Sequence, residues 1–151
     1  MTVLRPITAV PTLMRWRIEV IRNVFGVEPH RRLLVANRQY YRAHMADGSH
    51  FALVAEEDGE DCGCGAVCFT AELPSPDNPS GLCAYLMNIY VRRQFRNRGI
   101  GHRIVRRLVE EARQRGCGKI YLETTTEGKS LYLSSGFGKM HDMMKYHAEE
   151  N

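Results

Sequence analysis

The chain has 151 residues, 44% of them hydrophobic and 25% charged, which excludes a disordered or fibrous protein and predicts one domain over residues 1–151. No stretch approaches the roughly 18 consecutive apolar residues of a membrane-spanning helix, and we expect no membrane partner. The net charge of +4 is mild. The arginines between residues 92 and 107 favour a bound anion over nucleic acid, so we expect no nucleic-acid partner.

The five cysteines are an odd number and are typical of reduced thiols rather than of a disulfide framework. Together with the lack of a leader pattern, they predict a cytoplasmic location. Cys62 and Cys64 form only a C-x-C, and the other three add no paired ligand spacing. We therefore expect no metal site.

The first half of the chain predicts two helices followed by a hairpin. A short strand comes first, then the helices, then two strands joined by a turn at residues 58–61. Three prolines in the next stretch indicate a surface loop. The expected elements are strand Val3–Ile7, helices Thr12–Phe25 and Pro29–Met45, strands Phe51–Glu56 and Gly65–Glu72, and loop Leu73–Gly81.

The second half predicts alternating strands and helices. Apolar residues at a 3.6-residue period indicate an amphipathic helix after a long apolar strand. The expected elements are strand Leu82–Val91, helix Gly99–Arg115, strand Lys119–Thr124, helix Lys129–Ser135 and strand Lys139–His147. This order predicts an α/β (α+β) fold with a mixed central sheet flanked by helices, in which helix 99–115 connects two parallel strands.

The most informative stretch is Arg96–Gly101, between the long apolar strand and the amphipathic helix. It predicts a tight glycine turn and a helix N-terminus, where main-chain N–H groups lack intrahelical partners. Gly99 and Gly101 would let the main chain approach an anion closely. Nearby arginines raise the positive potential: Arg92, Arg93, Arg96 and Arg98. The candidate ligand is a pyrophosphate.

Two other phosphate-binding motifs fail at single residues. A dinucleotide fingerprint needs glycine or alanine three residues after Gly101, where this chain has Ile104. A P-loop ending in Gly128-Lys129-Ser130 needs glycine five residues before Gly128, where this chain has Glu123. The pattern that remains is R-x-x-G-x-G.

That pattern resembles the Q/R-x-x-G-x-G/A signature of the GNAT superfamily, the acyl-CoA-dependent N-acetyltransferases. Further segments follow in the family's order: Tyr90-Val91, Leu122-Glu123-Thr124-Thr125, Leu131-Tyr132 and Gly136-Phe137. The resemblance implies a GNAT-like fold in which two parallel strands splay apart. It also implies acetyl-CoA as the co-substrate.

By this resemblance, main-chain amides would hold the CoA pyrophosphate, and the pantetheine arm would pair with the splayed strand. Tyr132 matches the family's general acid, which protonates the departing thiolate; its alternative role is a buried aromatic that anchors the short helix. An amide near Ile89 would polarise the thioester carbonyl. The implied cofactor-binding residues are Ile89, Tyr90, Val91, Arg96, Asn97, Arg98, Gly99, Ile100, Gly101, His102 and Tyr132.

An alkylamine acceptor is mostly protonated at neutral pH, so we expect a base or a water chain. We rank Glu123 first as the catalytic base and Glu72 second, with Tyr85 and Asn88 as candidate water or substrate ligands. Each of these is equally consistent with an ordinary surface position. Four methionines could line an acceptor pocket, although apolar strand residues usually belong to the core: Met87, Met140, Met143 and Met144.

The sequence thus predicts an enzyme that transfers an acetyl group from acetyl-CoA directly to a primary amine. The acceptor is a small molecule, a protein N-terminus or a lysine. A catalytically silent CoA-binding regulatory module is the alternative. The predicted strand near the C-terminus would be an edge strand, which favours a homodimer.

Overall fold

The computed structural model describes residues 1–148 and contains a five-stranded mixed sheet in the order β1-β2-β3-β4-β5. The first four strands pair antiparallel, and β5 pairs parallel to β4. The strands are β1 (Thr2–Pro6), β2 (His50–Glu57), β3 (Glu60–Ala71), β4 (Leu82–Val91) and β5 (Lys119–Leu122). The predicted mixed sheet, with its parallel pair, is confirmed.

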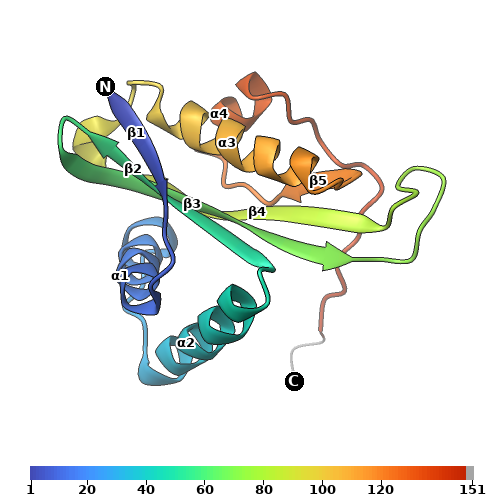
Figure 1. Cartoon of the computed structure of the whole chain (residues 1–151), viewed down its shortest axis with the longest axis horizontal. Helices are drawn as coiled ribbons and strands as arrows, with labels where there is room; N and C mark the ends of the chain where they lie inside the picture. The colour runs from blue at the N-terminus through green and yellow to red at the C-terminus, as the bar shows by residue number, and fades with distance from the viewer. Residues whose placement is uncertain (149–151) are drawn as a thin grey trace.

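The helices form a layer on each face of the sheet (Figure 1). Helices α1 (Val10–Val20) and α2 (Arg31–Ala46) cover one face, and α3 (Ile100–Gln114) and α4 (Lys129–Ser134) lie on the other. A π-helical turn, Ile21–Phe25, continues α1, and a 3-10 turn, Arg93–Phe95, lies between β4 and α3. When α1 is counted together with its π-helical turn, the predicted helices agree with the observed bounds to within two residues.

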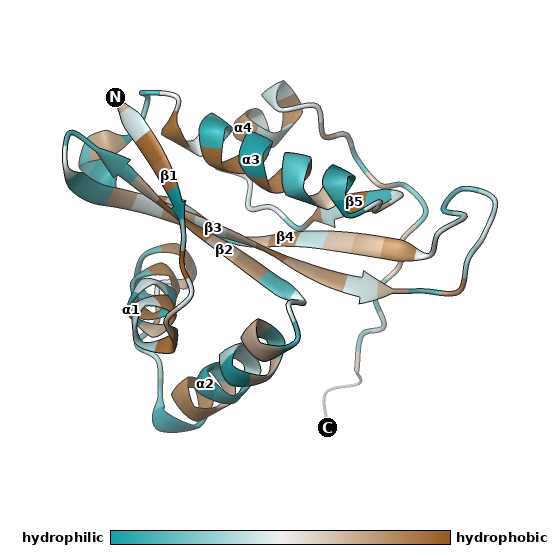
Figure 2. Cartoon of the chain, viewed as in Figure 1, coloured by the Kyte–Doolittle hydropathy of each residue, from teal (hydrophilic) through white to brown (hydrophobic). Residues whose placement is uncertain are grey.

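Each face of the sheet packs against its own apolar cluster. The stripe predicted on α3 is buried, and Figure 2 shows its apolar segments alternating with hydrophilic ones along the helix. Leu53, Ala84 and Leu86 face this helix. On the other face, Trp16 and Tyr41 pack with residues of β2, β3 and β4. Because side chains alternate along a strand, neighbouring β4 residues belong to opposite clusters.

The hairpin between β2 and β3 is tighter than predicted. Asp58 and Gly59 alone form the turn, with φ of 52° and 81°, and positive φ at both central residues is the geometry of a two-residue hairpin. Glu60 and Asp61 therefore belong to β3, which begins five residues before the predicted strand.

The predicted final strand, Lys139–His147, is wrong. Residues 139–147 form no strand, and β5 pairs with β4 alone among the described residues. Met140, Met143 and Met144 are 45%, 53% and 98% exposed, so the expectation that they belong to the core is also wrong. A segment with apolar residues forms a strand only where a neighbouring strand supplies backbone partners. Within residues 1–148, no helix has both the length and the hydropathy needed to cross a membrane.

Candidate active site

Strand β4 loses one of its two neighbours halfway along its length. It pairs with β5 only from Cys83 to Leu86, opposite Lys119 to Leu122. Met87, Tyr90 and Val91 then pair with β3 alone. The β5 side of this stretch is an open strand edge that can receive another extended chain. The predicted pantetheine-binding residues, Ile89, Tyr90 and Val91, lie on it.

A β-bulge marks the point where the two strands part. Two steps along β3, from Ala66 to Cys64, face three steps along β4, from Met87 to Tyr90, and Asn88 has a φ of 58°. The extra residue shifts the alternation of side chains, because Leu86 and Ile89 both pack toward α3. The sequence of β4 does not predict this bulge, since neither a glycine nor a proline occurs in that strand.

The turn after β4 presents main-chain donors. Among the described residues, no backbone acceptor is found for the N–H groups of residues 97 to 102. Asn97 and Gly99 have φ of 63° and 79°, and the first turn of α3 contains no acidic residue. Free amides and the positive end of the helix dipole therefore coincide here, as in an anion-binding helix N-terminus.

The two glycines of the motif, Gly99 and Gly101, are favoured for different structural reasons. A Cβ at Gly99 would meet nothing within 4 Å, so its φ of 79° is what favours glycine. A Cβ at Gly101 would lie 3.2 Å from Leu131 Cδ2 of α4. Gly101 therefore lets α4 pack against the first turn of α3, rather than only clearing space for an anion.

The arginines before the helix are partly engaged by the protein. Arg92 makes a bidentate pair with Glu19, at 2.9 and 3.0 Å, and lies 4.8 Å from the centre of the Trp16 ring. Arg96 donates from Nε to the Val91 carbonyl at 2.9 Å. Arg98 lies over the Phe95 ring. Arg92 is thus neutralised, and the positive potential at the turn rests on the other arginines.

Tyr132 is half-buried on α4 and packs against the cluster that includes Ile89 and Val91. Its ring meets Phe137 edge-on, with centroids 6.1 Å apart. Burial raises the pKa of the Tyr132 hydroxyl above its usual value near 10. Within residues 1–148 no hydrogen bond is found for this hydroxyl, so the group is a protonated donor without a partner among the described residues.

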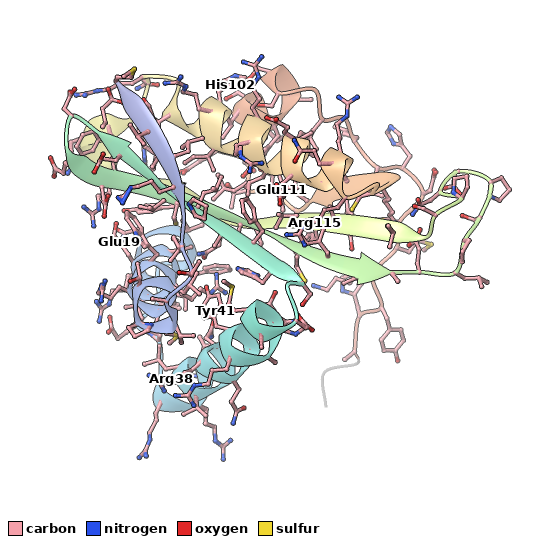
Figure 3. All side chains as sticks on the ribbon, viewed as in Figure 1. Glu19, Arg38, Tyr41, His102, Glu111 and Arg115 are labelled. Carbon is pink, nitrogen blue, oxygen red and sulfur yellow. The ribbon has the colours of Figure 1, made fainter. Side chains whose placement is uncertain are left out.

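A cavity of about 670 Å³ lies between α3 and α4. Its lining includes His102, Arg106 and Arg113 of α3, with Ser134 and Ser135. Ser134 Oγ is 2.8 Å and Ser135 Oγ 3.2 Å from the His102 ring nitrogens, and Figure 3 labels His102 on α3 near α4. Of these lining residues, only His102 was predicted from the sequence as a cofactor-binding residue. The helical spacing of four between His102 and Arg106 was a usable signal that both share a face.

Glu123 follows β5 immediately, at the mouth of the gap between the strands. Tyr85 lies next to it: burial, followed by the negative charge of Glu123, raises the pKa of Tyr85 to about 12. Tyr85 also packs on Tyr121, with ring centroids 5.1 Å apart. Since Ala84 and Leu86 face α3, Tyr85 faces the side of the sheet that carries α1 and α2.

Glu72 lies at the other end of β4 and does not belong to this site. It accepts hydrogen bonds from Asn78 Nδ2 at 3.3 Å and Lys119 Nζ at 3.2 Å. Its strand neighbour Ala71 pairs with Leu82, about 16 Å along the strand from Met87. Across residues 1–148, no cluster of three or more His, Cys, Asp or Glu is arranged to bind a metal ion.

The sequence profile of the Acetyltransferase (GNAT) family matches residues 12–137. The chain belongs to the GNAT family. The predicted resemblance and the predicted fold class are therefore confirmed. The match begins in α1 and ends just after α4, so it includes the open edge of β4, the glycine turn and Tyr132.

Among curated GNAT relatives, glucosamine 6-phosphate N-acetyltransferase 1 from Oryza sativa is 37% identical over 90 residues, 58% of this chain and 53% of that protein. Thialysine N-epsilon-acetyltransferase from Sus scrofa is 28% identical over 103 residues, 54% of this chain and 61% of that protein. The chain thus spans about half to three fifths of the length of these curated relatives.

Solved GNAT structures match over nearly their full length. A GCN5-related N-acetyltransferase from Ralstonia eutropha has a TM-score of 0.79 at 27% identity, covering 99% of this chain and 100% of that one. A predicted acetyltransferase from Clostridium acetobutylicum, solved with acetyl-CoA, has a TM-score of 0.87 at 24% identity, covering 97% and 96% of the two chains. The match to the Clostridium acetobutylicum structure shows the shared fold.

Proposed function

We propose that this protein transfers an acetyl group from acetyl-CoA to a primary amine by direct attack in a ternary complex. The observation that carries the proposal is the open edge of β4 beside the unpaired amides that begin α3. A pantetheine arm has the amide groups to pair with the first, and a pyrophosphate has the charge to bind the second.

The nucleotide end of CoA fits the cavity between α3 and α4. This cavity adjoins the glycine turn through His102, and its charged lining residues are two arginines, Arg106 and Arg113, and one carboxylate, Glu110. Within the described chain neither arginine has a carboxylate partner. Their charge is suited to the phosphates of the nucleotide. Arg96, Asn97, Arg98, Gly99, Ile100 and Gly101 would hold the pyrophosphate through their main chain.

In the transfer itself, the lone pair of the amine attacks the thioester carbonyl carbon and the C–S bond breaks. The departing thiolate takes the proton of the Tyr132 hydroxyl, whose raised pKa keeps it protonated at neutral pH. A main-chain amide at Ile89 would stabilise the negative charge on the carbonyl oxygen. Tyr132 would also contact the cofactor at its sulfur.

Glu123 is our candidate for the base that takes the proton lost by the amine. It lies where β4 and β5 part, beside Tyr85 and on the α1–α2 side of the sheet. Tyr132 packs on the α3 side. An acid and a base on opposite sides of the gap would let the amine enter from one face while the thiolate leaves on the other.

The acceptor class is an amine of a small molecule or of a protein, with the small molecule favoured. The named relatives act on glucosamine 6-phosphate and thialysine, both small amines. The homodimer stays a prediction, and the edge strand on which it was based does not form at residues 139–147. A cytoplasmic location is retained on the ground that all five cysteines are free thiols.

Release of the CoA thiol across a panel of amines tests the proposal against a silent CoA-binding module. We expect wild-type protein to release thiol, and Tyr132→Phe to lower kcat by about 10²–10⁴-fold while acetyl-CoA affinity stays within about threefold. Tyr146→Phe, at a position 87% exposed, is the matched control. If the protein binds acetyl-CoA yet no amine releases thiol, the silent module is the correct function.

A further inference from the structure

The helices α1 and α2 cover the face of the sheet from which we propose that the amine enters, here called the acceptor side. This helical layer is strongly positive. Residues 10–46, which form α1, the π-helical turn and α2, contain seven arginines and two glutamates. Their net charge of +5 exceeds the +4 of the whole chain. Both glutamates are already paired, Glu19 with Arg92 and Glu28 with Arg22. The layer therefore has an excess of positive charge that no acidic residue of its own offsets.

Arg17 places one of these positive charges beside the β4 bulge. Its Nε donates to Asn37 Oδ1 of α2 at 3.0 Å, and its Nη1 donates to Asn88 Oδ1 at the β4 bulge at 2.8 Å. Its guanidinium carbon also lies 5.5 Å from the centre of the Phe25 ring. Arg17 thus joins both acceptor-side helices to the strand where β4 and β5 part.

The partners of Arg17 are all neutral. Its side chain is half-buried, and within residues 1–148 it forms no ion pair with a carboxylate. A guanidinium has five N–H donors, of which the two asparagines accept two. Three donors and a full positive charge are thus left in a partly desolvated place. An anion binds such a group more strongly there than at the open surface.

The position of Arg17 relative to the open edge sets the size of the ligand. Asn88 directly precedes Ile89, so their Cα atoms are about 3.8 Å apart. An anionic group on Arg17 would lie on the order of 10 Å or less from the main chain that we propose holds the thioester. That separation suits a small molecule that carries both an amine and an anion.

We propose that the acceptor is an anionic amine, and that Arg17 binds its phosphate or carboxylate group. This inference rests on the proposed acetyl transfer and names the substrate class for the same site. Arg17 would act as a specificity-determining residue, because it orients the acceptor without touching the acetyl group. The charge of the surrounding helices would favour the approach of such a substrate.

The test compares acceptors that differ only in the anion. One pair is glucosamine 6-phosphate and glucosamine, and the other is lysine and its decarboxylated counterpart cadaverine. We expect wild-type protein to prefer the anionic member of one pair by about 10- to 100-fold in kcat/KM, the range of a charge-assisted hydrogen bond. The phosphate and carboxylate pairs distinguish the two sources of the anion.

Three variants assign that preference to Arg17. Arg17→Gln should bring the preference to within about threefold of unity. Arg17→Lys keeps the positive charge but not the planar set of N–H donors, and it should retain part of the preference. Arg15→Gln removes an arginine of the same helix whose side chain, within residues 1–148, bonds to Thr12 alone, and it should keep the wild-type preference. A purely structural role of Arg17 would lower both members of a pair equally.

Equal kcat/KM within both pairs, or a preference that survives Arg17→Gln, overturns the inference. If no amine is acetylated, calorimetry of the CoA-loaded protein with the members of the same two acceptor pairs decides instead. Binding of an anionic member but not of its counterpart without the anion, lost in Arg17→Gln, supports the inference, and the lack of such a preference in both pairs with wild-type protein refutes it. Failure of the proposed acetyl transfer is seen separately, as the absence of acetyl-CoA binding or of thiol release.

Discussion

At the scale of single residues, the protonation state of Tyr132 leads to a testable prediction about the pH dependence of the reaction. Burial raises its pKa above the usual value near 10, so the hydroxyl remains protonated through neutral and mildly alkaline pH. We expect kcat to show no descending limb from Tyr132 below about pH 10. The measurement is kcat from pH 6 to pH 10. A descending limb below pH 9 that disappears in Tyr132→Phe would contradict the assignment.

His50 is a second residue with a defined titration, and it concerns stability. It is 4% exposed, Tyr40 Oη lies 2.9 Å from its Nδ1, and Nε2 has no partner within the described chain. Burial, followed by the positive charges of His44 and Arg17, lowers the pKa of His50 to about 4. The imidazole is therefore neutral in the folded protein at neutral pH.

This depressed pKa predicts a loss of stability in acid. The unfolded chain, with a histidine pKa near 6.5, binds the proton first, so unfolding becomes easier as pH falls from about 6.5 to about 4. The two values imply a contribution of about 3 kcal/mol to that decline. Urea unfolding at pH 7 and pH 4.5 measures it. His50→Gln should flatten the decline, whereas exposed His141→Gln should leave it unchanged; equal declines in all three proteins would refute the assignment.

At the scale of elements, the contact of α3 with the sheet depends on the absence of a side chain at Gly65. A Cβ there would overlap Ile104 Cγ2 and lie 3.2 Å from Leu108 Cδ1. We expect Gly65→Ala to lower the free energy of unfolding by about 1–3 kcal/mol through overpacking. Urea unfolding measures this. Gly138→Ala, where a Cβ meets nothing within 4 Å, is the control, and a difference below about 0.5 kcal/mol between the two would contradict the expected packing.

The elements predicted from sequence are correct where the pattern is contiguous in sequence. They are wrong where the structure depends on pairing with a strand that is distant in sequence. The stripe of α3, the glycine turn and Leu131-Tyr132 are contiguous patterns, and each forms the expected element. Residues 139–147 contain four apolar residues, Met140, Met143, Met144 and Tyr146, but the sheet supplies no neighbouring strand for them. The bulge at Asn88 likewise depends on the register of β4 against β3, which the sequence of β4 alone does not determine.

At the scale of the whole molecule, the sheet divides the proposed site into a cofactor side and an acceptor side. The glycine turn, α4 and the cavity lie with α3, whereas Arg17, Tyr85 and Glu123 lie toward α1 and α2. The cofactor side was predictable because the family's motif occupies one continuous stretch of sequence. The acceptor side was not, because its contacts join residues far apart, such as Arg17 and Asn88, which are 71 positions apart.

The central claim is that the open edge of β4 and the N-terminus of α3 together bind acetyl-CoA. Calorimetric titration with acetyl-CoA tests it most directly, using wild-type protein, Gly101→Asp and Gly101→Ala. We predict binding at one site per chain, retained by Gly101→Ala, and abolished by the carboxylate of Gly101→Asp, which repels the pyrophosphate at the helix N-terminus. Gly138→Asp should bind as wild type does. No binding to wild-type protein, or equal binding to Gly101→Asp, would contradict the claim.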